Sequence, residues 1–149
     1  MVKWLLDTNV VSENVRRRPK QAVIDWVMQR PPSQVAISIV TMAELWAGAQ
    51  TTANPERRAE LVHWVEHEVE STFADRILPL TIDILIEWLQ IGRRTSVAGR
   101  TRAPADLLLA ATARVHDLIV VSRNARDFAG TGVLVYDPWN DKTHHMELV

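Results

Sequence analysis

The sequence of 149 residues contains no cysteine, which excludes disulfides, thiolate zinc sites and a cysteine nucleophile. It also lacks any apolar run near the roughly 18 residues that a membrane-spanning helix needs. The first residues predict a strand, so no signal peptide is expected. The net charge is only −1, which argues against binding nucleic acid through bulk charge. These absences predict a soluble, cytoplasmic protein.

Length and composition predict one domain, residues 1–149, with a complete hydrophobic core. Hydrophobic residues make up 47% of the chain, which is ordinary for a globular protein. There is no internal repeat, low-complexity tract or linker. Only the tail of about residues 140–149, which contains His144 and His145, is expected to be loose.

Short apolar runs alternate with amphipathic helical patterns along the chain. The runs that predict strands lie at residues 2–6, 35–38, 77–80, 118–121 and 133–135, with the last at an edge. A helical pattern after Thr81 is expected to end near Gly92. Strands that alternate with helices predict an α/β fold, in which a parallel sheet is covered by helices on both faces.

Polar residues follow two of these expected strands. Asp7 comes directly after the first strand, and Asn124 and Asp127 follow the strand at residues 118–121. The carboxyl ends of parallel strands meet at one edge, where open α/β sheets bind ligands. The alternative for Asp7 is a purely structural role as the cap of the next helix.

Two further carboxylates lie near the starts of expected helices. Glu44 has capping-box spacing from Thr41, and Asp106 follows Pro104 in a first helical turn, where the helix dipole favours an acid. Those are the structural readings. However, a helix that begins near Ser38 places Glu44 in the second turn of a mostly apolar helix, where a carboxylate needs a partner or a metal.

Carboxylates that converge at one edge of a sheet would repel each other strongly at neutral pH. A hard divalent cation removes this repulsion, and Mg²⁺ and Mn²⁺ prefer carboxylate and water oxygens while also binding phosphates. An ion held in this way can activate water and stabilise an in-line phosphoryl displacement. The residue types therefore favour a nuclease-like site.

Other polar clusters have less distinctive patterns. His63 and His67 have zinc-ligand spacing, but no third ligand is evident, and we expect both to be solvated. Two basic clusters are either solvated helix ends or phosphate contacts. They are Arg16–Arg18 and the group Arg93, Arg94, Arg100 and Arg102.

Four segments, in this order and spacing, resemble the PIN domain. They are Leu5–Asn9, Thr41–Leu45, Ala105–Asp106 with the apolar helix that follows, and Val121–Phe128. The ending Tyr136–Trp139 is similar to that of one subgroup. The likeness is closest to the VapC and FitB type, the toxin halves of bacterial toxin–antitoxin pairs, and it covers essentially the whole chain.

This resemblance implies a three-layer α/β/α sandwich with a five-stranded parallel sheet and a Mg²⁺- or Mn²⁺-dependent endoribonuclease. It implies that Asp7 and Asp106 are the main metal ligands, with Glu44 bound directly or through water. The fourth acidic position falls on Asn124, where many relatives have Asp, and Asp127 is the alternative source of that charge. The loss of one charge at Asn124 predicts one firmly bound metal ion.

The resemblance also suggests supporting roles at the site. Thr8, Asn9 and Ser38 would position phosphate or water, and Arg123 or Arg102 would hold the substrate backbone. The competing functions are a DNA nuclease or phosphatase on the same fold, a receiver-like module, and an inactive PIN scaffold that acts by protein binding.

The resemblance implies partners as well. These are an RNA substrate, a second copy of the chain, and a cognate VapB- or FitA-like antitoxin, through which alone the complex would bind operator DNA. Exposed Trp46, Trp64 or Trp88 would contribute to these surfaces, since Trp is enriched at interface hot spots. The alternative for each Trp is core packing.

Overall fold

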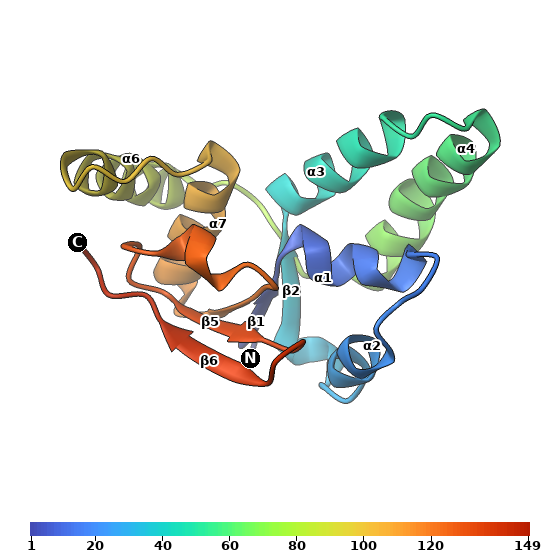
Figure 1. The fold of residues 1–149 in the computed structure, drawn as a ribbon, viewed down its shortest axis with the longest axis horizontal. Coiled ribbons are helices and arrows are strands. Elements are labelled where there is room, and N and C mark those ends of the chain that lie inside the picture. Colours follow the sequence, from blue (N-terminus) through green and yellow to red (C-terminus); the bar gives the residue numbers. More distant parts are fainter.

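A six-stranded sheet in the order β3-β2-β1-β4-β5-β6 forms the centre of the computed structural model, which describes residues 1–149 (Figure 1). The strands are β1 (Trp4–Leu6), β2 (Val35–Ser38), β3 (Ile77–Leu78), β4 (Ile119–Val121), β5 (Leu134–Asp137) and β6 (Lys142–His145). The first five are mutually parallel, so their carboxyl ends meet at one edge of the sheet.

The C-terminal tail differs from the expectation of a loose segment. Residues 142–145 form β6, which pairs antiparallel with β5, so the sheet has six strands instead of five and β5 is internal. Beyond β6, the Met146 N–H donates to the Val133 carbonyl (2.9 Å) and the Val149 N–H to the Gly130 carbonyl (3.2 Å). The polar sequence Lys-Thr-His-His has no apolar alternation from which a strand could be predicted. The strand forms through backbone pairing with β5.

Helices fill the connections between the strands. They are α1 (Thr8–Ser12), α2 (Gln21–Met28), α3 (Ile39–Gln50), α4 (Pro55–His63), α5 (Glu70–Thr72), α6 (Ile82–Val97) and α7 (Pro104–His116), with the short 3₁₀ turns η1 (Glu13–Val15), η2 (Pro32–Gln34) and η4 (Ala125–Phe128) and the π-helical segment η3 (Trp64–Val69). Side chains of Ser38, Asn54 and Thr81 cap α3, α4 and α6, as residues of these types commonly do.

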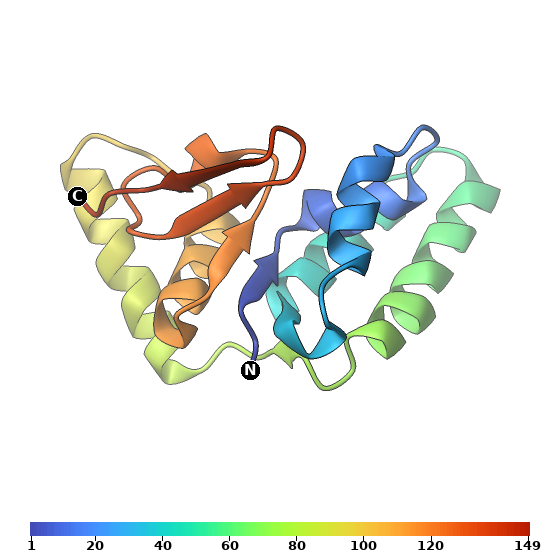
Figure 2. The same ribbon diagram turned by 90° about the horizontal axis from the view of Figure 1, so that it is seen from below.

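Helices cover both faces of the sheet, which confirms the three-layer architecture. Leu5 and Val120 pack with α6 and α7, whereas their neighbours Leu6 and Val121 pack with α1, α2, α3 and η3. This split follows from the alternation of side chains along a strand. Figure 2 shows α6 and α7 on one side of β1 and the helices from α1 to α4 on the other.

Helix α6 is longer than the sequence predicts, because it continues through Gly92 to Val97. A single glycine costs a helix only about 1 kcal/mol, and Ile91 and Thr95 are both buried on its inner face. Of the three tryptophans considered for interfaces, Trp46 is 46% exposed, while Trp64 and Trp88 pack against the two core clusters. None of the helices has the length and apolar character needed to cross a bilayer.

Candidate functional site

Asp7 lies where β1 ends and α1 begins. Leu6 is paired with Val121 of β4, so Asp7 and Ser122 are neighbours immediately beyond the paired residues. The Asp7 N–H continues this pairing by donating to the Val121 carbonyl at 2.9 Å. Parallel pairing therefore fixes the Asp7 backbone at the carboxyl edge of the sheet.

Asp7 is only 8% exposed, and neutral donors surround its carboxylate. Its Oδ1 accepts a hydrogen bond from the Thr8 N–H (2.8 Å), which caps α1. Its Oδ2 accepts from the Ser122 hydroxyl (2.7 Å) and from the Asn9 amide (3.2 Å). Asp7 therefore caps α1, as the structural alternative predicted, but two side chains also hold its second oxygen.

Ser122 is a part of the site that sequence reasoning missed. Besides donating to Asp7, its Oγ lies 3.3 Å from the Asn9 Nδ2 and accepts from the Asn124 N–H at 3.1 Å. Asn9 in turn accepts from the Arg123 N–H at 3.1 Å. The signal in the sequence was a serine directly after an apolar run. Because that run forms β4 beside β1, Ser122 lies one position beyond the paired Val121.

Asp106 occupies the first turn of α7 and is half-buried. Burial, followed by the charges of Asp7, Asp127 and Glu44 in that order, raises the pKa of Asp106 to about 6. Only the Arg102 guanidinium acts in the opposite direction. The four acidic positions therefore share one electrostatic field, although they come from distant parts of the chain.

Burial also raises the pKa of Asp7 above its ordinary value, and the charges of Glu44 and Asp127 act in the same direction. The hydrogen bonds from Ser122 and Thr8 favour the ionised form and partly offset this shift. None of the four salt bridges in the structure involves any of these carboxylates. Their negative charge is therefore left without a bound basic partner.

The chemistry of this donor set fits a hard divalent cation, but the side chains do not form a closed cage. No group of three or more Asp, Glu, His or Cys side chains is arranged to ligate one ion directly. Mg²⁺ typically keeps several waters and binds through one or two carboxylates plus substrate phosphates. Uncompensated carboxylate oxygens at an accessible edge suit that mode.

Glu44 differs from the expectation of a buried carboxylate, because its side chain on α3 is exposed to solvent. The helix does begin at Ile39, but its buried positions are Thr41, Leu45 and Ala49, and Glu44 lies off that face. Its Oε1 accepts a hydrogen bond from the Thr8 hydroxyl at 2.8 Å. This contact links Glu44 to the residue that follows Asp7.

The two candidates for the fourth acidic position behave differently. The Asn124 side chain is exposed and makes no hydrogen bond, while its backbone N–H contacts Ser122. Asp127, in η4, raises the pKa values of both Asp7 and Asp106 by its charge. The fourth negative charge in the field is therefore that of Asp127.

The side chains of several other candidate residues make no hydrogen bond or salt bridge with the carboxylates. Ser38 is fully buried and accepts from the Val40 N–H at 3.0 Å, so its hydroxyl serves α3. The Arg123 guanidinium lies over the Trp139 ring, 5.3 Å from its centroid. The rings of the exposed His63 and His67 are tilted against each other with centroids 4.4 Å apart, and they belong to no metal-binding group of three side chains.

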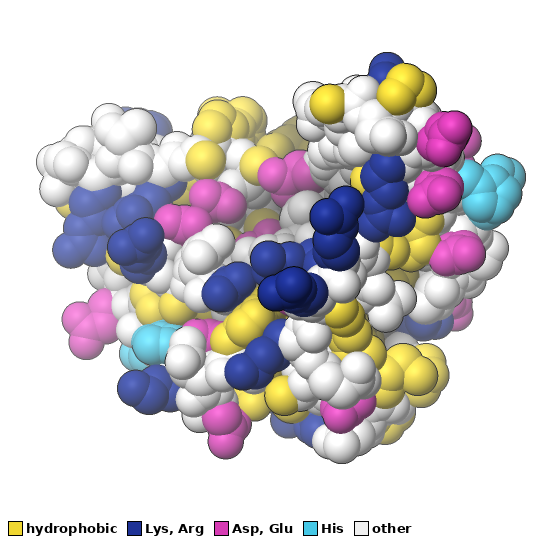
Figure 3. Space-filling model, turned by 45° about the vertical axis from the view of Figure 1, so that its right-hand side comes forward, with side chains coloured by type: hydrophobic (Ala, Val, Ile, Leu, Met, Phe, Trp, Pro, Cys, Tyr) yellow, Lys and Arg dark blue, Asp and Glu magenta, His cyan; other side chains and the backbone are white.

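Positive charge surrounds the acidic region. In Figure 3, acidic side chains lie in the hollow between the α6–α7 side and the α3–α4 side, and Lys and Arg side chains gather on both flanks of it. Arg102 is close enough to Asp106 to lower its pKa, and the Arg102 Nε is buried without a hydrogen-bond partner. A negatively charged chain would meet favourable charge on both sides of the carboxylates.

Comparison with known proteins identifies the family. The chain is 35% identical over 137 residues to the toxin FitB of Neisseria gonorrhoeae, covering 92% of this chain and 99% of that protein. It is 30% identical to a VapC ribonuclease of Sinorhizobium fredii, covering 91% and 96% of the two chains.

A solved structure of FitAB bound to a DNA fragment superposes with a TM-score of 0.85 at 33% identity, covering 95% of this chain and 99% of that chain. The model of the PIN domain family matches residues 4–134, a range that includes the four acidic positions. This chain therefore belongs to the PIN domain family.

Proposed function

We propose that this PIN domain is a metal-dependent endoribonuclease and the toxin component of a toxin–antitoxin pair. The ribonuclease and toxin names of its relatives support the activity. The observation that supports the chemistry is the shared field of Asp7, Glu44, Asp106 and Asp127, in which burial and mutual repulsion raise the pKa of Asp106 to about 6. Ionised together at neutral pH, these groups are best stabilised by a cation.

Asp7 and Asp106 would hold a Mg²⁺ or Mn²⁺ ion, with Glu44 bound directly or through water and Asp127 contributing charge. Such an ion supplies Lewis-acid stabilisation for the hydrolysis of an RNA phosphodiester. Ser122, Thr8 and Asn9 fix the orientation of the Asp7 carboxylate through three hydrogen bonds.

Glu44 is the most accessible of the carboxylates. Its Oε1 is engaged by Thr8, whereas no donor contacts its Oε2. That free oxygen would accept a proton from an attacking water. Arg102, whose charge already acts on Asp106, would contact the substrate backbone.

The partners follow from the same relatives. The solved FitAB assembly on DNA supports a FitA- or VapB-like antitoxin for this chain, with DNA bound through the antitoxin. We also propose a homodimer and a cytoplasmic location, where the RNA substrate is available. The exposed Trp46 on α3 is a candidate contact for either interface.

The test is cleavage of end-labelled RNA and of DNA of the same sequence, with Mg²⁺ or Mn²⁺ and with EDTA. Asp7→Asn keeps a side chain that can cap α1 but removes the charge, so RNA cleavage should be lost while the circular dichroism spectrum is unchanged. Asp83→Asn, an exposed acid in the first turn of α6, is the matched control and should retain full activity. Metal-dependent RNA cleavage by Asp7→Asn would refute the assignment, and cleavage of DNA alone would favour a deoxyribonuclease.

A further inference from the structure

A second charged site lies at the opposite end of the helix that Asp7 begins. The chain runs from Asp7 through α1 and η1 into Arg16 and Arg17, a path of about 14 Å at ordinary helical rises. There a hollow of about 740 Å³ is lined by Asn14, Val15, Arg16, Arg17 and Arg57. No acidic residue lines it, and Val15 is its only hydrophobic residue.

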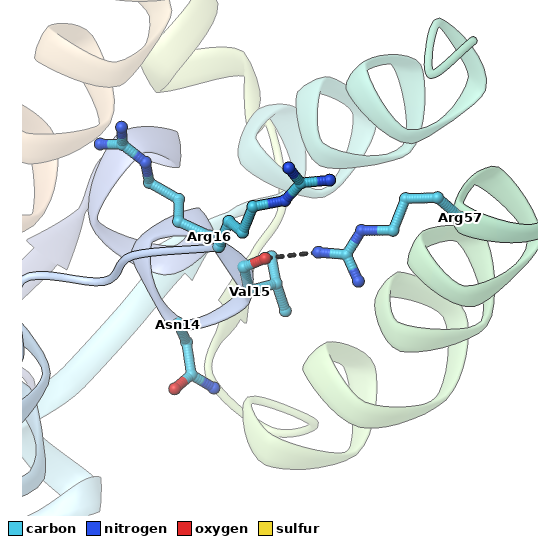
Figure 4. Close-up of a pocket in the computed structure, with 5 residues that line it drawn as sticks. Asn14, Val15, Arg16 and Arg57 are labelled. Atoms are coloured by element: carbon cyan, nitrogen blue, oxygen red, sulfur yellow. Dashed lines mark hydrogen bonds between the residues drawn. The ribbon is translucent and has the colours of Figure 1, made fainter. Parts of the chain in front are cut away.

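Two segments that are distant in sequence build this hollow, which distinguishes it from a frayed helix end. Arg57 comes from α4, and its Nη2 donates to the Val15 carbonyl at 2.5 Å, as Figure 4 shows. On the other side, the buried Glu13 accepts from the Arg16 Nη1 and from the Lys20 N–H, all at 3.4 Å. These contacts fix the backbone that presents the arginines.

The guanidinium groups are only partly neutralised. The Arg16–Glu13 and Arg57–Glu60 distances of 3.4 and 3.3 Å exceed the 2.7–2.9 Å typical of strong charge-assisted hydrogen bonds. Arg17 takes part in no salt bridge. The arginines that line the hollow therefore retain donors for an external acceptor, and a planar guanidinium matches the paired oxygens of a phosphate.

We infer that this hollow binds the phosphodiester backbone of the RNA substrate on one side of the cleavage site. The inference rests on the proposed ribonuclease function and adds to it the residues that grip the strand. A nucleic acid is favoured over an acidic peptide, because peptide-binding sites are anchored by buried apolar side chains and this hollow offers one valine. With a net charge of −1, the chain depends on such local sites for attraction.

The test compares two neighbouring substitutions that change the net charge equally. Arg17 lines the hollow and Arg18 does not, so Arg17→Gln is the test and Arg18→Gln is the matched control. Binding of a fluorescent single-stranded RNA is followed by anisotropy in EDTA, which prevents metal-dependent cleavage, over a range of salt concentrations. Loss of one phosphate contact should reduce the slope of log K against log salt by about 0.7 and weaken binding about fivefold at 0.1 M salt.

The expected result is this change for Arg17→Gln and wild-type behaviour for Arg18→Gln. Equal effects of the two substitutions, or no effect of either on a wild type that binds and cleaves RNA, would overturn the inference but leave the ribonuclease function standing. Weakened binding of a co-expressed antitoxin by Arg17→Gln alone, with RNA affinity unchanged, would make the hollow a protein-binding site instead. A wild type that neither binds nor cleaves RNA refutes the proposed function itself.

Discussion

The Ser122 hydroxyl donates a 2.7 Å hydrogen bond to Oδ2 of Asp7, across 115 positions of sequence. Both residues follow adjacent parallel strands, so the same backbone pairing that builds the sheet also brings them together. This bond favours the ionised form of a carboxylate whose pKa burial raises. Ser122 is therefore a positioning residue for Asp7.

Substitution Ser122→Ala should lower RNA cleavage and move the acidic limb of its pH profile to higher pH, because the Asp7 pKa loses an opposing hydrogen bond. Hydrogen bonds to charged groups contribute about 1.5–3 kcal/mol, which corresponds to roughly tenfold or more in kcat/KM. The measurement is kcat/KM as a function of pH. Ser33→Ala, at an exposed position in η2, is the control. An unshifted profile for Ser122→Ala would show that the bond has no role in ionising Asp7.

Substitution Glu44→Gln should separate activity from stability. The side chain is exposed and its one hydrogen bond, from Thr8, can be kept by an amide oxygen. Unfolding by urea should therefore change by less than about 0.5 kcal/mol, whereas cleavage should fall at least tenfold if Glu44 handles the metal or a proton. Full activity of this variant would remove Glu44 from the site.

The raised pKa of Asp106 predicts how the stability of the metal-free protein depends on pH. Its pKa is about 6 in the folded chain, against an ordinary value of 3.8. Between these values the folded state binds more protons than the unfolded state, so the free energy of unfolding falls as the pH rises, and the full penalty is present above about pH 6.

Asp106→Asn removes this penalty and should melt above the wild type at pH 7.5 in EDTA, with a smaller difference at pH 4.5. Solvent screens a half-buried carboxyl, so we expect roughly 2–4 °C, the shift that about 1 kcal/mol produces in a domain of this length. Differential scanning calorimetry at the two pH values measures it. A variant less stable than the wild type at pH 7.5 would show that the repulsion is compensated.

Addition of metal should stabilise the wild type more than Asp106→Asn. Mg²⁺ or Mn²⁺ at 100 times its dissociation constant stabilises a protein by about 2.7 kcal/mol, so the melting temperature of the wild type should rise on titration. Asp106→Asn should show little of this rise, because it lacks one of the two main proposed ligands. An equal increase for both proteins would place the ion elsewhere.

Removal of residues 142–149 should destabilise the fold, contrary to what a loose tail would do. The deletion exposes the edge of β5 and removes Met146, which packs against the core. The loss should reach about 1 kcal/mol, because full burial of such a side chain contributes about 1.5–3 kcal/mol and Met146 is only partly buried. Chemical denaturation measures it, and an unchanged midpoint would contradict the role of β6.

Much of the site could be predicted from sequence, because periodicity locates strand ends and helix starts. Asp7 after an apolar run and Asp106 after Pro104 were both identified in this way. Glu44 lies in this region, where it contacts Thr8, but it is exposed and not buried as expected, because helical spacing alone does not show which face of α3 meets solvent.

The remaining features depend on tertiary pairing. Ser122 becomes part of the site only once β4 is known to lie beside β1, which the chain order does not specify. The β6 sequence has no apolar alternation from which a strand could be predicted. Helix α6 continues through Gly92 because Ile91 before it and Thr95 after it are both buried. The action of the Asp127 charge on both Asp7 and Asp106 likewise depends on the folded arrangement, which the sequence does not specify.

The two outer strands of the sheet are unlike the buried ones in a way that matters at high protein concentration. β3 has only two residues, and β6 contains Lys142 and two histidines. Short or charged edges are poor templates for strand-to-strand growth between molecules. Neither edge of the sheet therefore favours amyloid-like polymerisation, even when no partner covers it.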